Sequence, residues 1–261
     1  MPATSVRLAR TVTGSGPGLA VAHGAGGGFQ ANFGPILDTL AARHTVVGVD
    51  YPGTGATPRA DGPLDLDDLA DELVAAAVET GLERFAVAGY SLGGMVAVRA
   101  AARHPGRVSA LVLSASMAAA DNRLRLITEV WARLHRAGDP DALARFLVPL
   151  ALGPDALAAL TPERLERVVA GTAATIPPGT AEHADLAGRA DVRADLAAIT
   201  APTLVVSTTA DRLVPPALHR ELAAGIPGAR LAELDSGHLP FAERPAEWAE
   251  LTNGFLAEAA G

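Results

Sequence analysis

Short apolar segments alternate with amphipathic segments along most of the chain. The apolar segments predict strands, which we place at residues 19–22, 45–49, 85–89, 108–113, 203–206 and 229–234. Strands that are apolar along their whole length suit a sheet that is covered on both faces, which is typical of parallel sheets. The repeated order of strand, helix and strand therefore predicts an α/β fold with a doubly wound, mostly parallel sheet.

The amphipathic segments between these strands predict helices. One apolar helical face begins within the acidic start Asp65-Leu-Asp-Asp68 and is formed by Leu66, Leu69, Leu73 and Ala77. Acidic residues suit the first turn of a helix because they oppose the positive end of its dipole. Further helices are expected at residues 95–103, 216–224 and 246–257.

The segment from residue 116 to residue 185 breaks the alternation, because its patterns are helical throughout. Its three apolar faces comprise Leu124, Ile127, Trp131 and Leu134, then Leu143, Phe146, Leu147 and Leu150, and then Leu165, Val168 and Val169. Asp139-Pro140 and Thr161-Pro162 are typical helix starts. Because each apolar face must cover something, we predict an all-helical cap at residues 116–185. It is inserted into an α/β core domain formed by residues 1–115 and 186–261.

Composition limits the partners of the chain. Its 261 residues carry a formal net charge of -8 without a local cluster of basic residues, which argues against nucleic acid and anionic membranes. The chain has no cysteine, so disulfides, thiolate catalysis and cysteine-based metal sites are excluded. The N-terminal residues lack the apolar core of a signal peptide, and no run approaches the roughly 20 apolar residues that span a bilayer. A cytoplasmic location is the resulting expectation.

A serine surrounded by glycines follows the strand at residues 85–89. The segment Gly89-Tyr-Ser91-Leu-Gly93 has the pattern Gly-x-Ser-x-Gly between a strand and a helix, which is the pattern of a nucleophile elbow. Glycine at both ends removes the Cβ atoms that would clash in so tight a turn. The alternative is an ordinary N-cap serine beside a glycine turn, because short motifs of this kind also occur by chance.

A serine nucleophile needs a base, and the base needs an acid. Among seven histidines, His238 lies in a loop after the last predicted strand, at the same sheet edge as Ser91. We expect His44, His104, His135, His183 and His219 to be surface or solvated residues. Asp211 follows the preceding strand, and the order Ser91, Asp211, His238 is the hydrolase order. The second candidate for the acid is Asp235, which is close to His238 in sequence but lies at the strand end.

A glycine-rich loop follows the first predicted strand, at residues 24–28. An oxyanion hole uses backbone amides, and the amides of Ala25 and Leu92 are the expected donors. His23 is then expected to brace the loop. The loop fits neither common phosphate-binding pattern, and its simplest alternative is a flexible turn.

Together these residues resemble the α/β-hydrolase fold superfamily across nearly the whole chain. The resemblance is carried by five features, namely His23-Gly24 with the glycines 26–28, the Asp-x-Pro-Gly-x-Gly segment at residues 50–55, the elbow at residues 89–94, Asp211 and Gly237-His238. It implies acyl transfer through an acyl-serine intermediate, with no metal and no organic cofactor. Superfamily members that use aspartate at the elbow, such as haloalkane dehalogenases and epoxide hydrolases, differ from this chain, which has Ser91.

The resemblance leaves the reaction and the substrate partly open. It implies a serine hydrolase for a small or medium carboxylic ester or thioester. Aromatic residues make up 4% of the chain, so an aliphatic pocket wall and an acyl substrate are expected. The alternatives are an acyltransferase or cyclase of a biosynthetic pathway, and a ligand sensor that keeps the fold without turnover. A thioester of coenzyme A or of a carrier protein is a further candidate partner, although the chain lacks a basic patch that would bind an acidic carrier.

Overall fold

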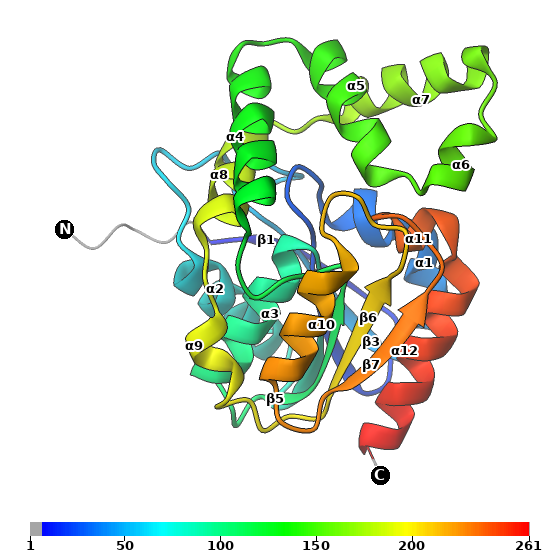
Figure 1. The fold of residues 1–261 in the computed structure, drawn as a ribbon. Coiled ribbons are helices and arrows are strands. Elements are labelled where there is room, and N and C mark those ends of the chain that lie inside the picture. Colours follow the sequence, from blue (N-terminus) through cyan, green and yellow to red (C-terminus); the bar gives the residue numbers. More distant parts are fainter. Residues whose placement is uncertain (1–6, 261) are drawn as a thin grey trace.

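A seven-stranded sheet runs through the centre of the computed structural model, which describes residues 7–260 (Figure 1). The strands are β1 Ala9–Thr13, β2 Gly18–Ala22, β3 Thr45–Asp50, β4 Phe85–Tyr90, β5 Val108–Ser114, β6 Thr203–Thr208 and β7 Arg230–Leu234. Their spatial order is β1-β3-β2-β4-β5-β6-β7, and every neighbouring pair from β3 to β7 is parallel. The predicted α/β fold with a mostly parallel sheet is therefore confirmed.

The edge strand β1 was not expected from the sequence. It pairs antiparallel with β3, and the three residues in its middle are exposed. An edge strand has one partner and little contact with the core, so it lacks the apolar run by which the six other strands were found.

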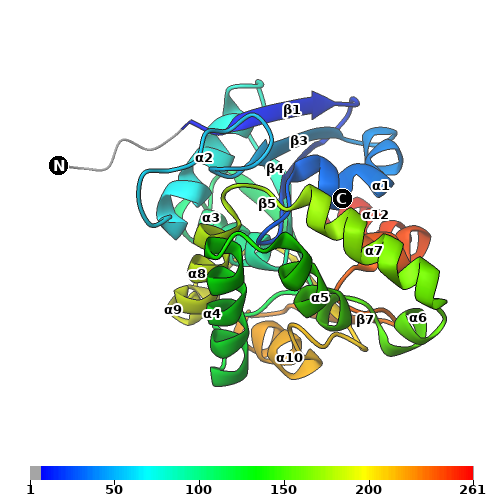
Figure 2. The ribbon, with the colours of Figure 1, turned by 90° about the horizontal axis from the view of Figure 1, so that it is seen from above.

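Helices cover both faces of the sheet (Figures 1 and 2). Helices α1 Phe29–Ala41, α11 Pro240–Glu243 and α12 Pro245–Ala260 contact one another on one face. Helices α2 Leu66–Val78, α3 Leu92–Arg103 and α10 Pro216–Gly225 share the core on the opposite face. Helix α1 was also missed in the sequence, because Gly34 and Pro35 interrupt its otherwise regular spacing of apolar residues.

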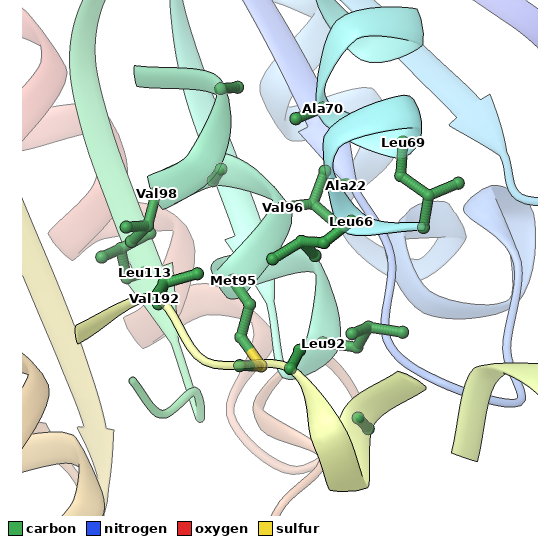
Figure 3. Close-up of a cluster of buried hydrophobic side chains, with 14 of the residues drawn as sticks. Ala22, Leu66, Leu69, Ala70, Leu92, Met95, Val96, Val98, Leu113 and Val192 are labelled. Carbon is green, nitrogen blue, oxygen red and sulfur yellow. The ribbon is translucent and has the colours of Figure 1, made fainter. Parts of the chain in front are cut away.

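Two apolar clusters explain why the central strands are hydrophobic throughout. Alternate residues of β2 belong to different clusters: Leu19 and Val21 pack with α1 and α12, whereas Ala20 and Ala22 pack with α2 and α3. Figure 3 shows part of the second cluster, in which Leu92, Met95 and Val96 of α3 lie near Leu66, Leu69 and Ala70 of α2. Burial on both faces is what a parallel sheet between two helical layers requires.

A series of helices connects β5 to β6. They are α4 Asn122–Arg136, α5 Pro140–Ala151, α6 Pro154–Ala158, α7 Pro162–Thr175, α8 Thr180–Arg189 and α9 Arg193–Leu196. As the sequence predicts, Asp139 and Thr161 cap α5 and α7, accepting hydrogen bonds from the amides of Ala142 and Arg164. The expected segment boundary at residue 185 lies inside α8. Ala144, Val148 and Val169 form a third apolar cluster that joins α5 to α7.

The structure bears in part on the expected absence of a signal peptide and of a membrane-spanning segment. Of the N-terminal segment judged to lack a signal peptide, residues 1–6 lie outside the described residues. Across residues 7–260, no helix is both long enough and apolar enough to cross a membrane.

Gly48 in β3 provides a test of the packing between sheet and helix. A Cβ atom at this position would lie 2.1 Å from the Phe29 ring, so Gly48→Ala should lower the free energy of unfolding by about 1–3 kcal/mol. Urea denaturation measures this change. The matched control is Gly171→Ala in α7, where a Cβ atom meets nothing within 4 Å. That variant should gain up to about 1 kcal/mol from helix propensity. Equal effects of the two substitutions would contradict the packing argument.

Candidate active site

Ser91 lies at the junction of β4 and α3, in a backbone conformation that few residues adopt. Its φ is 54° and its ψ is -121°, a strained combination for a residue with a side chain. The glycines on both sides make this turn possible. A Cβ atom on Gly89 would lie 2.3 Å from the Gly93 carbonyl oxygen, and one on Gly93 would lie 2.0 Å from the Ala22 carbonyl oxygen. The local pattern that singled out Ser91 thus reflects close contact of the backbone with itself.

His238 reaches Ser91 from the loop between β7 and α11. Its Nε2 accepts a hydrogen bond from the Ser91 hydroxyl at 3.0 Å, and its Nδ1–H donates to Asp211 Oδ2 at 2.7 Å. All three residues are buried, with 7%, 4% and 5% exposure for Ser91, His238 and Asp211. The structure therefore brings the three predicted residues into one hydrogen-bonded chain, although they are far apart in the sequence.

The Asp211 carboxylate is held in place by the loop that carries it. Oδ1 accepts hydrogen bonds from the amides of Leu213 and Val214, both at 2.9 Å, and Oδ2 accepts one from the Thr208 hydroxyl at 3.0 Å. These donors hold the carboxylate with Oδ2 directed to His238, which is the placement that orients an imidazole. The second candidate acid, Asp235, has an 82% exposed side chain and lies 3.8 Å from the Arg244 guanidinium instead.

Two amides next to Ser91 remain available as donors. In the loop after β2, the Gly24 amide donates to Asn32 Oδ1, the Gly26 amide to His183 Nδ1 and the Gly27 amide to the Gly24 carbonyl. Within the described residues the Ala25 amide has no such acceptor, and Ala25 lines the same cavity as Ser91. Leu92 is the first residue of α3, where an amide lacks an acceptor within the helix. Both amides can therefore donate to a bound group.

Two buried histidines support this loop. His23 Nδ1–H donates to the Gly24 carbonyl, and its Nε2 accepts from the Tyr51 amide at 3.0 Å. His183 Nε2–H donates to the Pro52 carbonyl at 3.0 Å, so its Nδ1 is the acceptor for Gly26. Burial, followed by electrostatic repulsion between the two rings when both are protonated, lowers the pKa of His23 to about 3, and burial lowers the pKa of His183 to about 4. Both rings are therefore neutral, with their tautomers set by these partners.

Three histidine predictions were wrong. His183 and His219 were expected to be solvated, yet both are fully buried, and His44, expected at the surface, is 8% exposed. The His219 Nδ1 atom is hydrogen-bonded to the Ser207 hydroxyl at 3.2 Å, and its Nε2 lies 3.8 Å from Asp211 Oδ2. Burial lowers the pKa of His219 to about 4 in spite of this carboxylate. Helical patterns alone do not reveal such burial, because the covering atoms come from distant segments.

Ser91 and His238 line a cavity of about 330 Å³. Its remaining lining is mostly aliphatic or small and comes from the loops after β2, β6 and β7, from β4, from α1, and from α4, α5 with the residue after it, and α7. These residues are Gly24, Ala25, Gly26, Gly27, Ala31, Asn32, Tyr90, Trp131, Leu147, Val148, Ala151, Leu152, Val168, Thr172, Thr175, Leu213 and Leu239. None of these lining residues is an aspartate, a glutamate or an arginine. The cavity therefore suits an uncharged, largely aliphatic group.

The comparisons with known proteins agree with the fold. A family model described as alpha/beta hydrolase fold matches residues 19–245. Pyrrolizixenacetamide deacetylase of Xenorhabdus hominickii is 32% identical, over 94% of this chain and 92% of its own length. A pimeloyl-[acyl-carrier protein] methyl ester esterase of Neisseria meningitidis is 33% identical, over 88% of this chain and 91% of its own. The crystal structure of the enol-lactonase from Burkholderia xenovorans superimposes with a TM-score of 0.85 at 26% identity, covering 98% of this chain and all of that one.

The buried histidines predict that the fold loses stability in mild acid. The pKa values of His23, His183 and His219 lie at about 3, 4 and 4 in the folded chain, below the ordinary 6.5. At a pH between the folded value and 6.5, each of these histidines is protonated in the unfolded chain but neutral in the folded chain. The stability is thus fully present above pH 6.5 and falls as the pH falls, by about 1.4 kcal/mol per pH unit for each histidine.

Urea unfolding between about pH 7.5 and pH 4.5 measures this slope. His219→Gln removes one of the three titrating groups, so its unfolding free energy should depend less steeply on pH than that of the unmodified chain. A chain whose stability stayed constant over this interval would be inconsistent with three neutral buried rings.

Proposed function

Because the chain belongs to the alpha/beta hydrolase fold family and is a hydrolase of ester-like substrates, we propose that it is a serine hydrolase. In this proposal it cleaves a small or medium carboxylic ester or thioester through an acyl-serine intermediate. The observation that carries the proposal is the continuous hydrogen-bonded chain from the Ser91 hydroxyl through His238 to Asp211. No cofactor or metal takes part in the proposed steps.

The proposed reaction has two halves. Ser91 Oγ attacks the carbonyl carbon while its proton passes to His238 Nε2, and Asp211 stabilises the imidazolium that forms. The amides of Ala25 and Leu92 donate to the oxyanion, each contributing about 3 kcal/mol by analogy with other serine hydrolases. The intermediate collapses and the leaving group takes the proton from His238. Water then attacks the acyl carbonyl carbon while His238 takes one of its protons. The second intermediate collapses by breaking the bond between the acyl carbon and Ser91 Oγ, which takes the proton back from His238, so the acid is released and the enzyme is regenerated.

We propose that the part of the substrate that enters the cavity is a neutral acyl group, because the lining is uncharged and largely apolar. A carboxylate on the acyl chain would be desolvated without a cationic partner among the described lining residues. We propose that residues 116–185 act as a cap, because α4, α5 and α7 supply much of the apolar wall above Ser91. Lids of this kind exclude water from the reacting carbonyl.

A carrier protein is a second candidate for the group that presents the acyl chain. The name of the meningococcal relative, a methyl ester esterase for a carrier-protein substrate, favours this possibility. A cavity of about 330 Å³ holds an acyl chain, so a carrier protein would stay outside it. Comparing hydrolysis of a carrier-linked ester with that of the same ester in free form separates the two cases.

Ser91→Ala should lower ester hydrolysis by at least about a thousandfold, because no other group in the proposed site can form the acyl-enzyme. The backbone strain at position 91 does not depend on the hydroxyl, so the thermal midpoint should change little. Release of p-nitrophenol from its acetate and butyrate esters measures the activity. Labelling of the unmodified chain by a fluorophosphonate, followed by peptide mapping, should find the label on Ser91. Unchanged turnover in the variant would exclude the proposed mechanism.

The two candidate acids can be separated by a matched pair of amides. Asp211→Asn should lower kcat on the order of ten-thousandfold, because an amide at this position no longer selects the required His238 tautomer. Asp235→Asn should leave kcat within about twofold, since that side chain is exposed beside Arg244, whereas the His238 imidazole is hydrogen-bonded to Asp211. A severe loss in Asp235→Asn together with a mild one in Asp211→Asn would reverse the assignment of the acid.

A further inference from the structure

The loop that carries His238 is bonded to the helical segment above it through its backbone. The His238 amide donates to the Ala151 carbonyl, at the end of α5, at 2.7 Å. The two backbones are so close that a Cβ atom on Gly237 would lie 2.2 Å from the Gly153 nitrogen and 2.7 Å from the Ala151 oxygen. The other side of the His238 peptide is held by the core, because the Tyr90 hydroxyl donates to the His238 carbonyl at 2.8 Å.

Glu243 joins the same two segments a second time. From α11, its carboxylate accepts hydrogen bonds from the Gly153 amide at 3.3 Å and from the Gly237 amide at 3.2 Å. Across residues 7–260 no arginine or histidine forms an ion pair with it, and the neighbouring Arg244 lies near Asp235 and Glu247 instead. The two amides are thus the principal partners of this half-buried carboxylate, and hydrogen bonds to a charged acceptor are stronger than neutral ones.

The joined segments have different functions in the proposed enzyme. Val148, Ala151 and Leu152 are cavity wall, whereas Gly237 precedes the proposed base. If the turn between α5 and α6 moved away from the core, His238 would lose the acceptor of its amide, and Glu243 would lose one of its two donors. The position of the wall and the position of the imidazole are therefore mechanically linked.

We propose that Glu243 is a positioning residue that latches the α5–α6 turn to the histidine loop, so that His238 aligns with Ser91 when this wall of the cavity is closed. The catalytic consequence rests on the proposed serine hydrolase function, whereas the latch itself does not. With such a latch, the hydrogen-bonded alignment of Ser91 and His238 depends on the α5–α6 turn being closed over the cavity.

Hydrogen exchange of the full chain tests the latch without any substrate. Glu243 Oε2 accepts from both amides, and Oε1 also accepts from the Gly153 amide. In Glu243→Gln an NH₂ group replaces one of these oxygens and the acceptor that remains is neutral, so the bonds to both amides are weakened. Exchange should therefore become faster, on the order of tenfold, in peptides covering residues 150–158 and residues 235–242, while α4 is unchanged. Glu250→Gln, an exposed position on α12, is the matched control and should change neither segment. Unchanged exchange in Glu243→Gln, or faster exchange in one of the two segments alone, would overturn the proposal.

Activity measurements test the positioning of His238. Glu243→Gln should lower kcat for p-nitrophenyl butyrate and the rate of fluorophosphonate labelling on the order of 10- to 100-fold, with KM within about twofold. Glu243→Ala should lower kcat further, and Glu243→Asp should restore part of the loss. If both segments exchange faster but kcat and labelling are unchanged, Glu243 does not position His238. If the unmodified chain hydrolyses no ester, the proposed function fails, and the exchange experiment still decides the latch.

Discussion

The turn between β4 and α3 is the constraint on which the rest of the structure depends. The backbone approaches itself so closely there that Gly89 and Gly93 cannot carry side chains, and Ser91 is held at a φ of 54°. The same contact brings the end of β2 against the start of α3, because the Ala22 carbonyl lies where a Gly93 side chain would be. The loop after β2 is therefore placed beside Ser91 by the same contact that aims the hydroxyl. One steric requirement thus positions both the proposed nucleophile and the loop that carries one of the amides proposed to stabilise the oxyanion.

Local sequence patterns were sufficient to predict the candidate site residues that lie in the segments directly after strands. In a parallel sheet the carboxyl ends of the strands meet at one edge, so local patterns after β4, β6 and β7 are enough to bring Ser91, Asp211 and His238 together. Choosing between Asp211 and Asp235 was harder, since both follow strands. The difference is local geometry: the loop after β6 provides three donors that turn the Asp211 carboxylate inward, whereas Asp235 extends into solvent.

Features that depend on distant segments could not be predicted from local patterns. His183 lies on a helix with polar neighbours and looks solvated, but the Pro52 carbonyl and the Gly26 amide enclose it from far away in the chain. The strand β1 is found through its pairing with β3 rather than through its own hydrophobicity. Glu243 likewise resembles any acidic residue near a helix start, and its two amide partners belong to segments 90 and 6 positions away.

The uncharged cavity explains why closure and alignment should be linked in this molecule. With a lining free of aspartate, glutamate and arginine, the proposed reaction relies on His238, on Asp211 behind it and on backbone amides to stabilise the charge that develops. Such interactions are strong where water is excluded and weak where it enters. An aligned His238 in an open cavity would face a solvated carbonyl, and a closed cavity with a displaced His238 would hold substrate without reaction. A carboxylate fixed on the core and shared by the Gly153 and Gly237 amides disfavours both of these mismatched states, because each requires one of its hydrogen bonds to break.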